Sequence, residues 1–119
     1  MHTQTSALTL HQREDGLICV ISGDIDHHSA RTVRTQIDEA LLSRRPARLI
    51  LDLSQVSFMD SSGLGLILGR FNKAAEIGTE FLLLNPNAAV TRILDIAGIG
   101  RLIKIERKKY HERTQTSDQ

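Results

Sequence analysis

Hydrophobic and polar residues follow two different periods along the chain, and each change of period marks a predicted element. In five short segments the apolar residues alternate with polar ones or form compact runs, which is typical of β-strands. In three longer segments they recur at steps of three and four positions, as on one face of an amphipathic helix. The predicted strands are residues 7–12, 17–22, 49–53, 80–84 and 102–105, and the predicted helices are residues 28–43, 61–76 and 88–97.

Turn and capping residues indicate where these elements begin and end. An Asp-Gly pair at 15–16 joins the first two strands into an expected N-terminal hairpin. Asp26 or Ser29 is placed to cap the first helix, since both residue types are favoured at that position. Residues 23–26 are expected to interrupt the second strand, and residues 54–60 are expected to form a loop before the second helix.

The element order along the chain is β-β-α-β-α-β-α-β. Neighbouring parallel strands need a crossover connection, and a helix between two strands supplies one. We therefore predict an α/β fold with a mixed, mostly parallel β-sheet flanked by α-helices. The length suits a single domain over 1–119, with a core at about 7–105 and a polar tail at 106–119.

The composition favours an aliphatic core and gives no reason for a polyanionic partner. Hydrophobic residues make up 40% of the chain but aromatic residues only 3%, so Leu, Ile, Val and Ala must fill the interior. The formal net charge is +1, from 15 basic and 14 acidic residues, which gives no electrostatic drive toward nucleic acid or an anionic membrane. We expect neither as a partner.

The cysteine usage and the N-terminal residues favour a soluble protein of the cytoplasm. Cys19 is the only cysteine and lies in an apolar run, so a buried, inert thiol is expected. The polar N-terminal residues lead into no signal peptide, and no window reaches the ~18 apolar residues of a membrane span.

Residues 57–70 carry the most chemical information. In a purely structural interpretation, Asp60 caps the second helix and the following leucines pack into the core. That interpretation leaves three glycines in or near one helix unexplained, since each costs roughly 1 kcal/mol relative to alanine. Glycines on one side of a helix let another backbone approach closely, so a docking partner would account for them.

Three other kinds of site are less well supported by the sequence. The glycines at 63–69 follow a strand, but their spacing exceeds G-x-G-x-x-G, and no acidic residue lies about 20 positions further on for a dinucleotide. The serines lack the G-x-S-x-G elbow of a hydrolase. His27 and His28 are adjacent at a helix start, where side chains point apart and rarely share a metal.

Ser61 is the candidate modification site. It lies at the expected start of the second helix, where free backbone N–H groups and the helix dipole tolerate a phosphoryl group. Phe58 and Met59 form an expected apolar rim beside Ser62 and Gly63, a surface suited to close docking. Phosphorylation would place a charge of about −1.5 to −2 in any contact made there.

Three motifs, in order, resemble one known family. They are Gly-Asp-Ile-Asp-His-His-Ser-Ala at 23–30, Ser-Phe-Met-Asp-Ser-Ser-Gly-Leu-Gly at 57–65 and Ile-Leu-Gly-Arg at 67–70. Together they resemble the sporulation anti-sigma factor antagonists, a branch of the STAS-domain family, and the similarity runs over roughly 10–105. The resemblance implies a STAS fold and a binding protein that is not an enzyme.

The resemblance also implies a phosphorylation switch. Unphosphorylated members of the family bind an anti-sigma factor that is also a serine kinase, and this binding frees the sigma factor. The kinase, which itself holds the ATP, modifies the first serine of the Asp-Ser-Ser-Gly motif, here Ser61, and a PP2C-type phosphatase reverses the modification. No cofactor of the chain itself is implied. The expected partner-binding residues are Asp26, Phe58, Met59, Asp60, Ser62, Gly63 and Gly65.

Two rival functions stay open from the residues alone. One is a STAS-type antagonist in a stress-response sigma pathway, although the Asp-His-His element at 26–28 favours the sporulation branch by resemblance. The other is a nucleotide-binding or hydrolytic protein, which would require nucleotide binding or turnover by the isolated chain.

Overall fold

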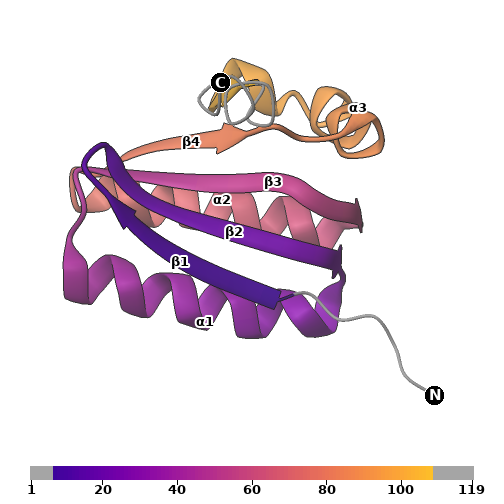
Figure 1. Ribbon diagram of the computed structural model, residues 1–119. Coiled ribbons are helices and arrows are strands. Elements are labelled where there is room, and N and C mark those ends of the chain that lie inside the picture. The colour runs from indigo at the N-terminus through magenta and orange to yellow at the C-terminus, as the bar shows by residue number, and fades with distance from the viewer. Residues whose placement is uncertain (1–6, 109–119) are drawn as a thin grey trace, which may run out of the picture.

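The computed structural model describes residues 7–108 of the chain and is drawn in Figure 1. It contains five strands, three α-helices and one short 3-10 helix within those residues. In chain order they are β1 (Ala7–Arg13), β2 (Gly16–Ile25), α1 (His27–Arg44), β3 (Arg48–Met59), α2 (Ser61–Glu76), β4 (Glu80–Leu84), α3 (Ala88–Ile96), η1 (Ile99–Arg101) and β5 (Lys104–Glu106).

The strands form one sheet in the order β1-β2-β3-β4-β5. β1 pairs with β2 antiparallel, and each later pair is parallel, which confirms the predicted mixed, mostly parallel sheet. Figure 1 shows α1 and α2 side by side along one face of the sheet, with α3 on the side of β4. No helix within residues 7–108 is both long enough and apolar enough to span a membrane.

Alternation of side chains in the strands builds an apolar layer on each face of the sheet. In β2, Leu17, Cys19 and Ile21 are fully buried in the cluster that includes the helices, whereas Ile18 belongs to a second cluster. Burying one Leu or Ile side chain contributes roughly 1.5–3 kcal/mol, so the layer between sheet and helices is the main source of stability. The smaller cluster contains Ile18, Ile50, Leu82 and Leu84.

The prediction of a loop at 54–60 is wrong, because β3 continues to Met59. The register between β2 and β3 shifts twice, and at each shift β3 carries one extra residue. Such a β-bulge breaks the two-residue alternation of a strand, so exposed residues come in pairs at 54–55 and 57–58. Residues 54–59 therefore do not show the alternation of apolar and polar residues from which a strand is predicted.

β2 also extends beyond its prediction, which placed an interruption at 23–26. The strand continues to Ile25, and Gly23 lies at the second register shift with a φ of +91°. A left-handed φ of this kind is tolerated by glycine at little cost, so Gly23 lets β2 continue past the register shift rather than ending the strand.

The last strand is shifted relative to its prediction at 102–105. β5 begins at Lys104, because Leu102 still belongs to the turn that closes η1. Glu106 is the last residue of β5 and not the first of the polar tail. The greater part of that predicted tail, 109–119, lies outside the described residues.

The single cysteine gives a direct test of the buried β2. Cys19 is fully buried, and this burial raises the pKa of its thiol to about 12. Because the thiolate is the reactive form, we expect the native protein not to react with Ellman's reagent at about pH 8. After denaturation the single thiol should react and release one equivalent of the coloured thionitrobenzoate. Stability should also fall as the pH rises above about 9, since the unfolded chain ionises this thiol first. Rapid stoichiometric labelling of the native protein would contradict this placement.

Candidate functional site

The pairing of β2 with β3 brings the starts of α1 and α2 together. Ile25 and Met59, the last residues of these parallel strands, face each other in the register. The backbone N–H of Asp60 donates to the carbonyl oxygen of Ile25 at 3.3 Å. Asp26 and Asp60, the residues that follow the two strands, are the N-caps of α1 and α2. Two helix N-termini and two carboxylates therefore meet at one end of the sheet.

Asp26 caps α1 through a capping box. Its Oδ1 accepts hydrogen bonds from the backbone N–H groups of His28, at 3.0 Å, and Ser29, at 2.9 Å. In return, Ser29 Oγ accepts a hydrogen bond from the Asp26 backbone N–H at 3.0 Å. Of the two capping candidates in the sequence, Asp26 is the cap and Ser29 completes the box. The hydrogen bond from the Ser29 N–H is the main cause that lowers the pKa of Asp26, so this exposed carboxylate is charged at neutral pH.

Ser61 is the first residue of α2 and is exposed. Asp60 precedes it as the N-cap, which confirms that prediction: its Oδ1 accepts a hydrogen bond from the Ser62 N–H at 2.8 Å. The Asp60 carbonyl oxygen accepts a second hydrogen bond from the Gly63 N–H at 2.9 Å. The cap fixes the first turn of the helix, and the Ser61 hydroxyl is presented to solvent at its start.

Two residues that the sequence placed on the partner-binding surface are buried instead. Met59 has no exposed surface, and Gly63 is also buried. A Cβ at position 63 would lie 2.7 Å from Met59 Cβ and 2.8 Å from its Sδ, which is too close for two such atoms. The expected apolar rim containing Met59 is therefore wrong, since this side chain belongs to the core, and Gly63 is explained by the packing of α2 on β3.

Gly65 and Gly69 have a different environment. Apart from their own stretch of helix, no heavy atom lies within 4 Å of a Cβ built on either residue. Together with Ser62 they line one side of a groove whose other side is formed by α1. Internal packing does not require glycine at these two positions. Of the three glycines, only Gly65 and Gly69 therefore support the expectation that another backbone approaches this helix.

Phe58 is the part of the expected apolar rim that does lie at the surface, with 51% of it exposed. Beside it, α3 contributes the walls of a shallow hollow of about 490 Å³. An exposed aromatic ring beside aliphatic side chains is typical of protein contact surfaces. The residues that α3 contributes are Ala88, Ala89, Arg92 and Ile93.

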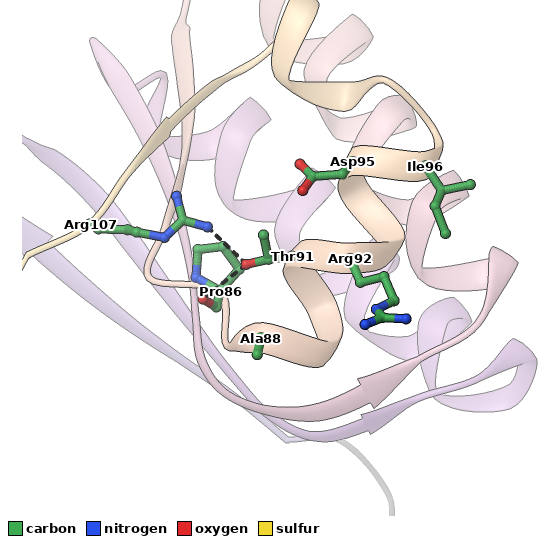
Figure 2. Close-up of a pocket in the computed structure, with 7 residues that line it drawn as sticks. All are labelled: Pro86, Ala88, Thr91, Arg92, Asp95, Ile96 and Arg107. Carbon is green, nitrogen blue, oxygen red and sulfur yellow. Dashed lines mark hydrogen bonds between the residues drawn. The ribbon is translucent and has the colours of Figure 1, made fainter.

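A further hollow, of about 480 Å³, lies between α3 and the segment that follows β5 (Figure 2). Figure 2 shows Arg107 reaching toward Thr91, to whose Oγ1 it donates a hydrogen bond at 2.8 Å. The Thr91 hydroxyl in turn donates to the carbonyl oxygen of Pro86 at 3.3 Å. These bonds tie the end of the sheet to α3, so we assign this hollow a structural role.

The geometry also bears on the ligand-binding alternatives. The N–H groups of Ser62 and Gly63, which would cradle a phosphate in a dinucleotide site, are occupied by Asp60. This occupation adds to the sequence arguments against a dinucleotide site. His27 lines the groove between the helices, and within residues 7–108 no three His, Cys, Asp or Glu side chains gather as metal ligands.

Gly63 and Gly65 form a matched pair for testing the packing of α2. We expect Gly63→Ala to destabilise the domain by about 1–3 kcal/mol, because the added methyl group meets Met59 inside the core. Gly65→Ala should leave stability unchanged or raise it by up to about 1 kcal/mol, since alanine is the better helix former and the space is open. Urea denaturation followed by circular dichroism measures both free energies of unfolding. Equal effects would contradict the packing role of Gly63.

The cap at Asp26 can be separated from its charge by two substitutions. Asp26→Asn keeps a good N-cap without the charge, so we expect it to melt close to wild type at neutral pH, whereas Asp26→Ala should melt at a lower temperature. In the wild type the carboxylate's contribution is present above the ordinary pKa of 3.8 and is lost as the pH falls through the lowered pKa of the folded state. Thermal melts across acidic pH should show this dependence in wild type and not in the Asn variant. If the Asn variant were as unstable as the Ala variant at neutral pH, the capping role would be disproved.

Known proteins share this arrangement of strands and caps. The profile of the STAS domain family matches residues 7–111. The anti-sigma F factor antagonist of Paenibacillus polymyxa is 42% identical over 89 residues, which cover 75% of this chain and 76% of that protein. The anti-sigma-B factor antagonist of Bacillus subtilis is 34% identical over 97 residues, which cover 82% of this chain and 87% of that protein.

Solved structures agree with the sequence relatives. The anti-sigma factor antagonist SpoIIAA in its unphosphorylated form matches with a TM-score of 0.73 and 26% identity, over 94% of this chain and 96% of that one. The Bacillus cell fate determinant SpoIIAA in its phosphorylated form matches with a TM-score of 0.70 and 26% identity, over 93% of this chain and 99% of that one. This chain therefore belongs to the STAS domain family, in the group whose members are named anti-sigma factor antagonists.

Proposed function

We propose that this protein is an anti-anti-sigma factor of the sporulation type, switched by phosphorylation of Ser61. In its unphosphorylated state it binds a cognate anti-sigma factor, which is also a serine kinase, and thereby frees the sigma factor. The observation that carries the proposal is the exposed Ser61 at the start of α2, within an Asp-Ser-Ser-Gly motif and directly after the helix cap Asp60. The similarity to a protein named anti-sigma F factor antagonist supports it.

The proposed partner surface surrounds Ser61 and combines charge, an aromatic ring and open backbone. The exposed carboxylate of Asp26 offers a pairing site for a basic side chain. Phe58 offers an apolar contact, and Gly65 allows a close approach to α2. The surface therefore consists of Asp26, Phe58, Asp60, Ser61, Ser62 and Gly65, without the buried Met59 and Gly63.

Phosphorylation of Ser61 would act on this surface through charge. It adds about −1.5 to −2 charges beside the two cap carboxylates, Asp26 and Asp60. The positive end of the α2 dipole favours an anion at this place even though Asp60 already engages the N–H groups of Ser62 and Gly63, so we expect the domain to stay folded with little backbone rearrangement. A partner pressed against the same end would have to desolvate a dianion next to two like charges. A penalty of ~3 kcal/mol already weakens binding roughly a hundredfold.

In this proposal the chain is the substrate of two enzymes and is not itself an enzyme. The partner kinase holds the ATP, so the chain requires no cofactor of its own. A PP2C-type serine phosphatase returns Ser61 to its hydroxyl form and restores binding. The cycle operates in the cytoplasm, and neither nucleic acid nor a membrane takes part.

A second candidate is an antagonist in a stress-response sigma pathway. The 34% identity to the anti-sigma-B factor antagonist of Bacillus subtilis favours it. The same surface and the same switch would serve either pathway, and only the kinase would differ. Pull-down with purified anti-sigma kinases of the sporulation and stress types distinguishes the two. The cognate kinase should be retained by the immobilised protein at a lower kinase concentration than the other kinase.

The central test is the site and effect of phosphorylation. Incubation with the cognate anti-sigma kinase and ATP should place one phosphate on Ser61, as read by tandem mass spectrometry. Ser61→Ala should fold normally, remain unmodified and bind the kinase permanently. Ser61→Asp should weaken binding less than phosphoserine does, because aspartate carries the smaller charge.

Ser62→Ala is the matched control, because it removes the neighbouring hydroxyl and keeps Ser61. It should still be phosphorylated once, on Ser61. Phosphate found on Ser62 in the wild type, or a phosphorylated protein that binds the kinase as tightly as before in calorimetry, would contradict the proposed switch.

A further inference from the structure

A groove of about 420 Å³ runs between α1 and α2 from the end that carries Ser61. α1 lines it with His27, Arg31 and Arg34, and α2 lines it with Ser62, Gly65 and Gly69. His27 directly follows the cap Asp26, and Ser62 directly follows Ser61. One end of the groove therefore adjoins the proposed partner surface. The two glycines leave the α2 side of the groove open.

Arg70 also lines this groove, although only 5% of it is exposed. Its Nε lies 2.8 Å from Oδ1 of Asp38 on α1, in an ion pair that is not aligned as a hydrogen bond. Its Nη1 is buried and has no hydrogen-bond partner among the residues that the structure describes. A buried donor without an acceptor is unfavourable, and because Arg70 lines the groove, an oxygen ligand that reached Nη1 from there would relieve this cost.

The positive charge of the groove is not balanced from within. Arg31, Arg34 and Arg70 face it, and in the described part of the chain Asp38 is the one carboxylate that pairs with any of them. Burial, and then the neighbouring Arg34, lower the pKa of Arg70, while Asp38 opposes this effect. Like charges held together in this way favour an anion between them.

The surface formed by the cap end and the groove is negatively charged at one end and positively charged at the other. Its cap end carries Asp26 and Asp60, and Arg34 lies eight residues after Asp26, roughly 12 Å further along α1. A partner that matches both ends needs a basic group near the caps and acidic groups about two helical turns away.

We infer that the groove between α1 and α2 docks an acidic segment of the anti-sigma partner, whose carboxylates pair with Arg31 and Arg34 and reach Arg70. The inference rests on the proposed function. It adds a second contact, separate from Ser61, and states that the partner segment bound there is acidic. It also gives Gly65 and Gly69 a role, because their missing side chains make room for the partner's backbone.

Three features favour a protein segment over a free phosphate. The N–H groups at the start of α2 that would bind a phosphate are already engaged by Asp60. The carboxylates of Asp26 and Asp60 at the cap end repel a small polyanion, whereas a protein segment can present a basic group there. The groove is also continuous with the surface around Ser61, so one partner can cover both.

The test is calorimetry of the unphosphorylated protein with the purified cognate anti-sigma factor, at low and high salt. Arg31 and Arg34 are exposed, so the Arg31→Gln/Arg34→Gln variant should fold normally, as a thermal melt will show. We expect it to bind at least about tenfold more weakly at low salt, with a smaller loss at high salt. Arg101→Gln on η1 removes the same charge from an exposed site away from the groove and should bind within about twofold of wild type.

A steric variant provides a second measurement. Gly69→Leu should fill the groove, leave the fold intact because the space beside position 69 is open, and weaken the same binding at least about tenfold. Wild-type affinity in both the double arginine variant and Gly69→Leu would overturn the groove as a docking site while the Ser61 switch stood. Absence of binding by the wild type would overturn the proposed function and the groove together.

A third experiment tests whether the groove binds a small anion in place of a protein segment. Inorganic phosphate and ATP are each titrated into the isolated chain, and amide shifts in the groove are followed by NMR. No saturable change below about millimolar concentration is expected. Saturable binding that Arg34→Gln abolishes would assign the groove to a phosphate ligand and overturn the acidic-segment inference.

Discussion

The parallel pairing of β2 with β3 is the constraint on which the rest of this surface depends. The pairing continues through two bulges to Ile25 and Met59, and the Asp60 N–H closes it on the Ile25 carbonyl. Because both helices leave adjacent parallel strands, their N-termini, caps and positive dipole ends lie at the same end of the sheet. Ser61 is exposed at that point and lies outside the core, while the ends of β2 and β3 hold the start of its helix in place.

The glycines of α2 show how one helix serves both the core and the surface. Gly63 faces Met59 so closely that no side chain fits, which draws α2 down onto the end of β3. Gly65 and Gly69 lie on the other side of the same helix with open space beside them. Tight packing beneath the first turn keeps Ser61 in a fixed position, and the open stripe beside it leaves room for a second protein.

Charge divides the same surface into two parts with different tasks. The caps hold two carboxylates at the end where a phosphate would be added, so modification there intensifies an existing negative field. The arginines further along the helices carry the opposite sign, and they include the buried Arg70, whose Nη1 has no hydrogen-bond acceptor among residues 7–108. Under the proposed switch, the groove would contribute affinity and orientation, and Ser61 would control whether the partner stays bound, because only the cap end would change its charge.

Features that depend on near neighbours in the chain could be predicted from the amino-acid sequence. The bounds of α2 and β4, the cap at Asp60, the buried thiol of Cys19 and the motif around Ser61 follow from interactions within about four residues or from the period of apolar side chains. Three features became visible only in the folded protein: residues 54–59 continue a strand, Met59 and Gly63 are buried, and Arg31, Arg34 and Arg70 line one groove. A bulge hides the alternation of a strand, and the contact between two helices joins residues more than thirty positions apart in the sequence. Neither leaves a local pattern, because each exists only once the sheet has paired and the helices have packed on it.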